Sequence, residues 1–256
     1  MAQTLQSVSQ ALKILELLQQ HPSLGVSDIS ELLAVSPSTA HRLLSTLLES
    51  NFVKQEQPGR KYQLGPLMSG SRTASAVEHC IEIATPHMLT LRDTTQETVH
   101  LATLTRAHTR FVAAYESPHI MRVTSRVGRQ LPAHATAAGK ILLSALSDAE
   151  LAELYPEGDL AQPTTGSIGT AAELRRHVAH AREVGYARNM SEAEPGVGAL
   201  AVPLRHPAGG VVCSLTVTGP DARLNPTGDV RLSAHERDLL RQLSATARSI
   251  EAELRY

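Results

Sequence analysis

The order of patterns in the first 64 residues constrains the fold more than any other feature of the sequence. Three short amphipathic helices are predicted there, followed by two strand-like segments. Apolar residues that recur three or four positions apart form one face of the first predicted helix: Val8, Ala11, Leu12, Leu15 and Leu18. We expect this helix to end before Pro22, because the residue that precedes a proline disfavours helical backbone.

The second and third predicted helices are close together in the sequence. The second is expected to start after Gly25 with Ser27 as its N-cap. Its inward-facing residues are predicted to be Ile29, Leu32 and Leu33. After a tight turn at residues 34–35, Ser36 suits the N-cap of the third helix, and Pro37 suits its first position, where the missing N–H costs no hydrogen bond. The apolar residues expected to be buried on the third helix are Ala40, Leu43, Leu44, Leu47 and Leu48.

Residues 52–54 and 62–64 are typical of two short strands that pair as a hairpin across Pro58 and Gly59. Three helices followed by a hairpin is the order of elements in a winged helix-turn-helix domain. Such a domain reads DNA with an exposed polar helix face in the major groove and with basic residues beside the hairpin turn. The residues expected to contact DNA are Ser36, Ser38, Thr39, His41, Arg42, Ser45, Arg60 and Lys61.

The alternative is an ordinary helical bundle with a solvated polar face. Residues 1–66 contain five Lys and Arg residues and five Asp and Glu residues, so this segment has no net positive charge. The order of elements nevertheless favours the DNA-binding interpretation. Affinity for DNA would then depend on the local placement of cations, on helix caps and on dimer avidity.

The composition changes near Gly65. The stretch 65–76, GPLMSGSRTASA, is predicted to be a connection, and the helix that follows it is expected to kink at Pro86. We divide the chain into a winged helix-turn-helix domain at 1–66, a linker and helix at 67–92, and a larger domain at 93–256. The strands expected in the larger domain are 98–104, 110–116, 120–123, 186–189, 200–204 and 211–218, the last two joined across 207–210.

Helices are expected to alternate with these strands. Residues 136–146 form one, and Ser/Thr-x-x-Glu capping boxes start others at Ser147, Thr170 and Ser233. Gly185 is a natural residue to end the helix that begins near Thr170. An antiparallel sheet flanked by helices predicts an α+β fold class for the chain.

Composition excludes several classes of protein. A hydrophobic fraction of 42% supports a packed core, and 24 basic against 25 acidic residues exclude a polycation that binds by bulk charge. Two cysteines cannot make a disulfide framework. No apolar run approaches the roughly 20 residues of a membrane span, and the N-terminal residues do not resemble a secretory signal. We therefore expect a soluble, cytoplasmic protein with no membrane partner.

Catalytic and metal sites are not expected. Gly139 and Lys140 resemble the end of a phosphate-binding loop, but His134 stands where that loop needs its first glycine. The 12 histidines are dispersed without zinc-like spacing, and no set of nucleophile, base and orienting group stands out. We therefore expect no metal, no cofactor and no enzyme activity. Glu192 and Glu194 lie in a loop-like stretch, where we expect solvated carboxylates.

Small residues at a helix start and on a strand suit a small anionic ligand. Ala137 and Ala138 open a predicted helix, and Thr216 and Thr218 project from the same face of a strand. Helix N–H groups, hydroxyls and apolar walls together would bind such a ligand. The alternative is a pair of ordinary sheet threonines beside a closely packed helix start.

Several separated motifs resemble one family. The segments SVSQALKILELL, SDISELLAVSPSTAHRLLSTLLESNFV and KYQLGP are similar to the DNA-binding domain of IclR-type transcriptional regulators. The segments VGRQLPAHATAAGKILLSAL, GYARNMSEAEPGVGALAVPL and LTVTGP are similar to the second domain of that family, so the resemblance covers nearly the whole chain. It implies a winged-helix domain joined by a dimerisation helix within residues 67–92 to a GAF-like effector-binding domain. It also implies a homodimer or homotetramer, a palindromic double-stranded DNA operator and a small-molecule effector, frequently an organic acid or aromatic compound.

The resemblance further implies which residues line the effector pocket: Ile120, Val123, Leu131, Ala137, Ala138, Asn189, Val197, Ala199, Thr216 and Thr218. Family members that bind small keto acids tend to have an acidic residue where Asn189 stands, and serines in place of the two threonines. The three small alanine side chains leave room for a ligand larger than a two- or three-carbon acid, such as a substituted aromatic acid or its amide-like derivative.

These observations together predict a ligand-responsive transcription factor that acts as a repressor. One rival is an enzyme with an accessory DNA-binding domain, and the lack of a catalytic set argues against it. The other rival is a purely architectural DNA-binding protein, and the large second domain argues against that.

Overall fold

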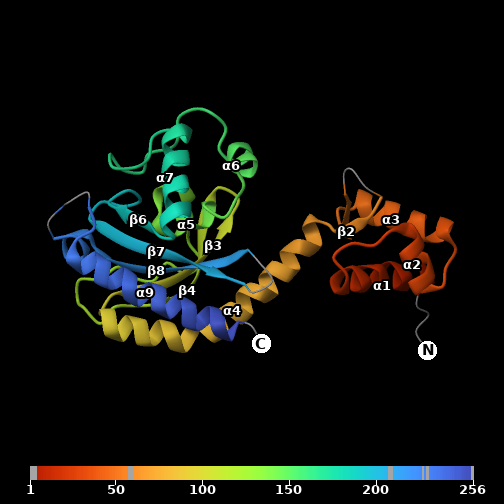
Figure 1. Ribbon diagram of the computed structural model, residues 1–256, viewed down its shortest axis with the longest axis horizontal. Coiled ribbons are helices and arrows are strands. Elements are labelled where there is room, and N and C mark those ends of the chain that lie inside the picture. The colour runs from red at the N-terminus through yellow and green to blue at the C-terminus, as the bar shows by residue number, and fades with distance from the viewer. Residues whose placement is uncertain (1–4, 57–59, 207–209, 227, 229–230, 255–256) are drawn as a thin grey trace. The chain divides into compact units, whose positions relative to one another are not determined.

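The structure is a computed structural model that describes residues 5–56, 60–206, 210–226, 228 and 231–254. The chain divides into two compact units, residues 1–76 and 77–256, and helix α4 (Pro66–Thr95) spans the boundary between them (Figure 1). The predicted connection at 65–76 is therefore wrong from Pro66 onward. Proline suits the first turn of a helix, and Pro86 lies inside α4 without ending it.

The first unit is a three-helix bundle with a hairpin. Its helices are α1 (Gln6–Gln20), α2 (Val26–Leu33) and α3 (Pro37–Glu49), followed by strands β1 (Val53–Gln55) and β2 (Tyr62–Leu64). The two strands pair antiparallel, and Val53 lies opposite Leu64. The core consists of side chains from all three helices and both strands, among them Ile14, Leu18, Ile29, Leu44 and Tyr62. The predicted order of three helices and a hairpin is confirmed, while the turn residues Pro58 and Gly59 lie outside the described residues.

Two details of the helix predictions are wrong. Helix α2 has Gly25 rather than Ser27 as its N-cap, because the carboxylate of Asp28 accepts the Gly25 N–H at 2.8 Å and anchors the helix there. Several apolar residues expected in the core are instead exposed: Val8, Leu12, Leu32 and Leu48. They lie at the edges of their helix faces, beyond the narrow stripe that packs inward.

The second unit contains one antiparallel sheet of six strands in the order β5-β4-β3-β8-β7-β6. The strands are β3 (Thr98–Thr105), β4 (His108–Tyr115), β5 (Gln130–Pro132), β6 (Ala187–Met190), β7 (Val197–Arg205) and β8 (Val211–Pro220). The remaining elements are η1 (Ala133–Ala135), α5 (Ala137–Leu143), α6 (Asp148–Leu154), α7 (Ala171–Val184), α8 (Asp221–Leu224) and α9 (Ala234–Glu253).

The two faces of this sheet differ sharply in chemistry. Leu and Val side chains of β3, β7 and β8 project to one face and pack against α4 and α9. Because side chains alternate along a strand, small and polar residues project to the other face, which α5 covers. Figure 1 shows α9 along one side of the sheet and α5 and α7 on the other. The predicted α+β class is confirmed.

One local prediction in this unit is wrong, and two short elements were not predicted. Residues 120–123 form no strand, because Val123 offers its carbonyl to the Thr98 hydroxyl at 2.6 Å rather than to a neighbouring strand. The short edge strand β5 and the helix α8 were not predicted, since each is only three or four residues long. The antiparallel pairing of β7 with β8 is confirmed, and residues 207–209 of their turn lie outside the described residues.

Candidate functional site

The start of α3 is fixed by Ser36, as predicted. Its hydroxyl accepts the N–H of Thr39 at 3.2 Å and lies 2.9 Å from the hydroxyl oxygens of both Ser38 and Thr39. Pro37 follows at the first helical position. This cluster of hydroxyls places polar groups at the exposed N-terminal end of the helix, where a DNA-reading helix needs them.

The remaining predicted side chains of α3 are exposed along its outer face. Ser38, His41, Arg42 and Ser45 are exposed, and Thr39 is half-buried. The Ser45 hydroxyl donates to the His41 carbonyl at 2.9 Å, so its proton is already engaged within the helix. No ion pair holds Arg42 among the residues that the structure describes, which leaves its guanidinium available for an external anion.

His41 faces the hairpin. It lines a hollow of about 500 Å³ together with Arg60 and Lys61, which flank β2, and with residues 25–27 at the start of α2. Arg60 and Lys61 place two cations in this hollow, while the Gly25 N–H on its α2 side already donates to the Asp28 carboxylate. The structure therefore brings three of the predicted DNA contacts, from two separate elements, to one place.

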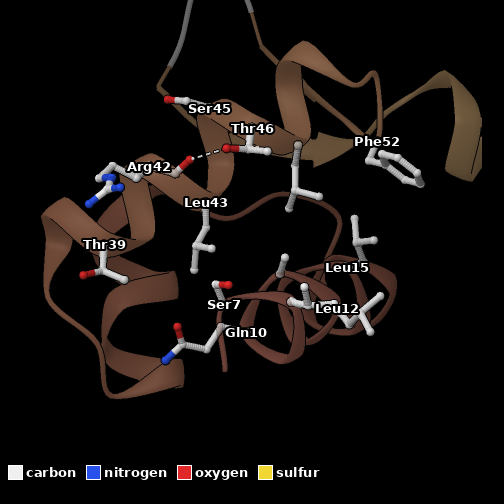
Figure 2. A pocket seen from close by; sticks show the side chains of 13 residues that line it. Ser7, Gln10, Leu12, Leu15, Thr39, Arg42, Leu43, Ser45, Thr46 and Phe52 are labelled. Carbon is white, nitrogen blue, oxygen red and sulfur yellow. Dashed lines mark hydrogen bonds between the residues drawn. The ribbon is translucent and has the colours of Figure 1, made fainter. Parts of the chain in front are cut away.

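Thr39, Arg42 and Ser45 face a second groove, of about 770 Å³, between α1 and α3 (Figure 2). Figure 2 shows the polar side chains at one side of this groove, and Leu12, Leu15 and Phe52 at the other. On α3, His41 thus faces the hollow beside the hairpin, whereas Thr39, Arg42 and Ser45 face the groove.

A second candidate site lies on the face of the large sheet that α5 covers. Strand register places Asn189 beside Ala199, and Ala199 beside Thr218, across β6, β7 and β8. The next strand, β3, places His100 beside Thr216. All of these side chains are buried. Four residues predicted from separate motifs therefore lie on one face of one sheet.

The other residues predicted for the effector pocket are scattered more widely. Ala137 packs with Ala199, and Ala138 packs with Phe111 and Leu131. Val123 is buried in a loop, and Val197 is half-buried at the start of β7. Ile120 does not reach this face, because its side chain is 99% exposed in the loop after β4.

The small side chains of this site serve helix packing. Ala137 and Ala199 share a buried apolar cluster with Ile141 and Ala201, so α5 lies close against the sheet. The start of α5 is capped internally, because the hydroxyl of Thr136 accepts the Gly139 N–H at 2.9 Å. The expectation that the alanines leave open space finds no support in this packing.

Asn189 is held by the protein itself. Its amide nitrogen donates to the Ala135 carbonyl at 2.8 Å, and its amide oxygen accepts the Glu192 N–H at 2.9 Å. These two bonds join β6 to η1 and to the segment before β7. The side chain orders this end of the sheet.

Sequence reasoning missed His100, Phe111 and Arg126. The rings of His100 and Phe111 meet edge to face at 5.2 Å, and Arg126 lies 6.0 Å above the Phe111 ring while pairing with Glu194 at 2.6 Å. Burial and the positive charge of Arg126 lower the pKa of His100 to about 3. The alternation in TVHLAT, with His100 in phase with Thr98 and Ala102, was a usable signal for His100, whereas Arg126 lies in a loop without a pattern.

Lys140 and Glu192 also occupy unexpected surroundings. The Lys140 Nζ lies 2.7 Å from both carboxylate oxygens of Glu192; the Lys140 side chain is buried, and the Glu192 side chain is 13% exposed. Burial lowers the pKa of Lys140 and raises the pKa of Glu192, while the mutual attraction of the two charges opposes both shifts. The expectation that Glu192 is solvated is therefore wrong. Its partner lies 52 residues away, on another element.

Groups of three or more metal-ligating side chains do not occur in the part of the chain that the structure describes. Among the described helices, none is long and apolar enough to cross a membrane.

Comparison with known proteins gives both units a family. The family model described as bacterial transcriptional regulator IclR C-terminal matches residues 73–252, and the IclR helix-turn-helix domain matches residues 7–57. The chain is 33% identical over 225 residues to the HTH-type transcriptional regulator XynR of Escherichia coli strain K12, covering 86% of this chain and 88% of that protein. It is 29% identical over 251 residues to the HTH-type transcriptional repressor AllR of the same strain, covering 96% and 92%.

A solved structure extends this similarity to the fold. The crystal structure of Thermotoga maritima IclR matches with a TM-score of 0.62 and 25% identity, covering 98% of this chain and 99% of that one. The winged helix, the small and polar sheet face beneath α5 and these matches together place the chain in the IclR family of bacterial transcriptional regulators.

Proposed function

We propose that the protein is a repressor that binds a specific DNA operator and whose operator affinity changes when a small organic acid binds its C-terminal unit. The single observation that carries the DNA-binding part is the capped, polar N-terminal end of α3. It presents Arg42, which no described residue holds in an ion pair, and lies beside the hairpin residues Arg60 and Lys61. The relative AllR is a transcriptional repressor, which supports negative regulation by this protein.

DNA recognition would divide between the face of α3 that carries Arg42 and the hollow that His41 shares with Arg60 and Lys61. Arg42, with Ser38 and Thr39, would reach base edges or phosphates in the major groove, because a guanidinium can pair bidentately with guanine. His41, Arg60 and Lys61 would bind the phosphate backbone from the hollow beside the hairpin. Since the first 66 residues have no net charge, these few cations would supply most of the electrostatic affinity.

The sheet face beneath α5 would bind the effector. Asn189, Ala199 and Thr218 are neighbours in the strand register there, with Thr216 two residues along β8, and Ala137 packs against Ala199. Ala138 and Leu131 pack together with Phe111. We retain aromatic acids among the candidate effectors. Effector binding and DNA binding would be linked, so that whatever the ligand does to operator affinity, the operator does equally to ligand affinity.

The active form would be a homodimer or a pair of dimers, with the dimerisation helix within residues 67–92. An isologous pair of α3 helices would match a palindromic operator. The relatives found by comparison are transcriptional regulators. We accordingly propose regulation without catalysis and without a cofactor.

Selection from genomic DNA tests this proposal. The full-length protein, incubated with fragments of the host genome at physiological salt, should enrich a fragment that contains an inverted repeat near a promoter. An organic acid that binds the protein should weaken retention of that fragment. Enrichment of random fragments alone, with no dependence on sequence, would refute operator recognition.

A further inference from the structure

The exposed side of α9 carries a groove of about 860 Å³, which we call the arginine groove. The residues of α9 that line it include Arg237, Leu240, Arg241, Ser244 and Arg248, and Tyr186 joins them from the segment between α7 and β6. All three arginines are exposed. Among the described residues that line the groove, none carries a carboxylate. The groove therefore gathers positive charge, although the whole chain has a formal net charge of -1.

Little of this charge is neutralised within the protein. Arg248 forms no ion pair with any residue that the structure describes. Arg241 pairs with Asp238 at 2.5 Å, but its side chain is 79% exposed, and ion pairs on the surface are weak. The guanidinium of Arg237 donates to the carbonyl of Leu232, which carries no charge. The three arginines are thus available to an anionic partner.

The spacing of the polar lining residues indicates the shape of that partner. Positions 237, 241, 244 and 248 are separated by four, three and four residues, so their side chains form one stripe along α9. The stripe covers eleven residues, which is roughly 16 Å of helix. The same alternation of three and four residues lets two helices meet along their lengths. Charges spread over this length fit an elongated segment better than a single small anion.

The chemistry of the groove favours an acidic helix over other occupants. A guanidinium pairs bidentately with a carboxylate, and the half-buried Tyr186 and the buried Leu240 give the groove an apolar part. A nucleic acid would use the arginines through its phosphates and leave that apolar part without a contact. A second copy of α9 is unsuitable, because two-fold pairing would set arginine against arginine.

We propose that the arginine groove docks an acidic amphipathic helix of a partner protein. The helix lies along α9, pairs its carboxylates with Arg237, Arg241 and Arg248, and places an apolar side chain against Tyr186. Among the described lining residues, none belongs to the proposed operator contacts or to the proposed effector site. The inference therefore does not depend on the proposed function.

Fluorescence anisotropy of labelled synthetic peptides with the full-length protein tests this assignment. The Glu peptide is helical and carries Glu at four positions separated by four, three and four residues, with Leu beside them. The Gln peptide has Gln at those four positions, and the Lys peptide has Lys. A fourth peptide has the composition of the Glu peptide with its glutamates spread around the helix.

Three double or single variants complete the design. Arg241→Glu/Arg248→Glu reverses the charge of the groove, and Arg241→Gln/Arg248→Gln only removes charge. Arg176→Glu is the matched control, because Arg176 is an exposed cation on α7 outside the groove. All three variants should unfold at close to the wild-type temperature, because the substituted side chains are exposed.

The Glu peptide should bind the wild-type protein about tenfold more tightly than the Gln peptide and the peptide with dispersed glutamates, as expected for several ion pairs that act together. The charge-reversed variant should lose this advantage and prefer the Lys peptide. The Gln variant should bind the Glu and Gln peptides almost equally, and Arg176→Glu should behave as wild type.

Equal binding of the Glu and Gln peptides to wild type, or Glu-peptide binding that both groove variants retain, would overturn the proposal. Equal binding of the peptide with dispersed glutamates would refute alignment along α9. Two further measurements address other occupants. If the charge-reversed variant also loses affinity for a short shuffled DNA duplex, the groove binds nucleic acid instead; if its mass in sedimentation equilibrium falls, the groove holds a second copy of the chain instead.

Discussion

The ammonium of Lys140 on α5 lies 2.7 Å from both carboxylate oxygens of Glu192, in a largely buried ion pair that joins α5 to the segment between β6 and β7. The same segment is joined to Asn189 through the Glu192 N–H. This ion pair therefore connects α5, on one side of the proposed effector site, to Asn189 on the sheet.

Breaking this pair from one side should destabilise the fold strongly. Lys140→Met leaves the Glu192 carboxylate buried without its partner, and we expect a loss of about 3–5 kcal/mol in the free energy of unfolding. The double variant Lys140→Met/Glu192→Leu should recover much of this loss. Urea denaturation measures both. The exposed pair of Arg241 with Asp238 is the control, where Arg241→Met should cost less than about 1 kcal/mol. If Lys140→Met and Arg241→Met lower the free energy of unfolding by similar amounts, the Lys140–Glu192 pair does not have this stabilising role.

The buried His100 should make stability depend on pH in the acid range. The unfolded chain protonates this residue near pH 6.5, whereas the folded protein keeps it neutral down to a pKa of about 3. The contribution of neutral His100 to the free energy of unfolding is therefore fully present above pH 6.5. It is lost as the pH falls toward 3, and the loss is about 2 kcal/mol at pH 5. The His100→Asn variant should lose correspondingly less stability between pH 7 and pH 5. Identical pH profiles of unfolding for the two proteins would show that folding does not lower the pKa of His100.

Gly139 should tolerate no side chain. A Cβ at this position would collide with the backbone carbonyl oxygen and Cα of Ala133, where α5 passes η1. We expect Gly139→Ala to cost at least about 3 kcal/mol, since the collision is with main-chain atoms. Gly166→Ala is the matched control, because its nearest contact is the Ser191 carbonyl oxygen at 3.5 Å. Thermal unfolding of the two variants compares them directly, and equal midpoints would disprove the close approach.

Two substitutions in the first unit should have different effects on DNA binding. Arg42→Ala should cost about 1–3 kcal/mol of operator binding and relax the preference at one base position. Lys61→Ala should weaken all DNA similarly and reduce the slope of log affinity against log salt by about 0.9. Fluorescence anisotropy at several salt concentrations separates the two effects. Arg248→Ala, in the second unit, serves as the control cation, and affinities unchanged by both test substitutions would show that α3 and the hairpin are misassigned.

The parts of the fold that local chemistry determines could be predicted from the sequence. Ser36 before Pro37 specified the start of α3, and Ser147 and Ser233 each form the complete capping box expected of them. Thr170 caps α7 as expected, although Glu173 turns its carboxylate to the Gly169 N–H instead of completing the box. The conformation of residues 120–123 has no local sequence signal, because the Val123 carbonyl accepts a hydrogen bond from Thr98, 25 residues away.

In the candidate sites too, some features follow from local sequence patterns and others from contacts between distant segments. The polar face of α3 is a local pattern, and so is the alternation that placed Thr216 beneath α5. The partner of Lys140 and the surroundings of His100 depend on contacts between elements 25 to 118 residues apart, as the Thr98–Val123 and His100–Thr218 contacts illustrate. No pattern within a window of the sequence reports such pairings, and it is these that decide which side chains are buried and which remain unpaired.

The most direct test of the central claim is an anisotropy titration of the full-length protein with two duplexes of equal length, at one physiological salt concentration. One duplex carries the promoter region upstream of the protein's own gene, and the other is a shuffled sequence of the same composition. We predict binding to the promoter duplex at least about 10³-fold tighter than to the shuffled one. Equal affinity for the two duplexes would contradict the account.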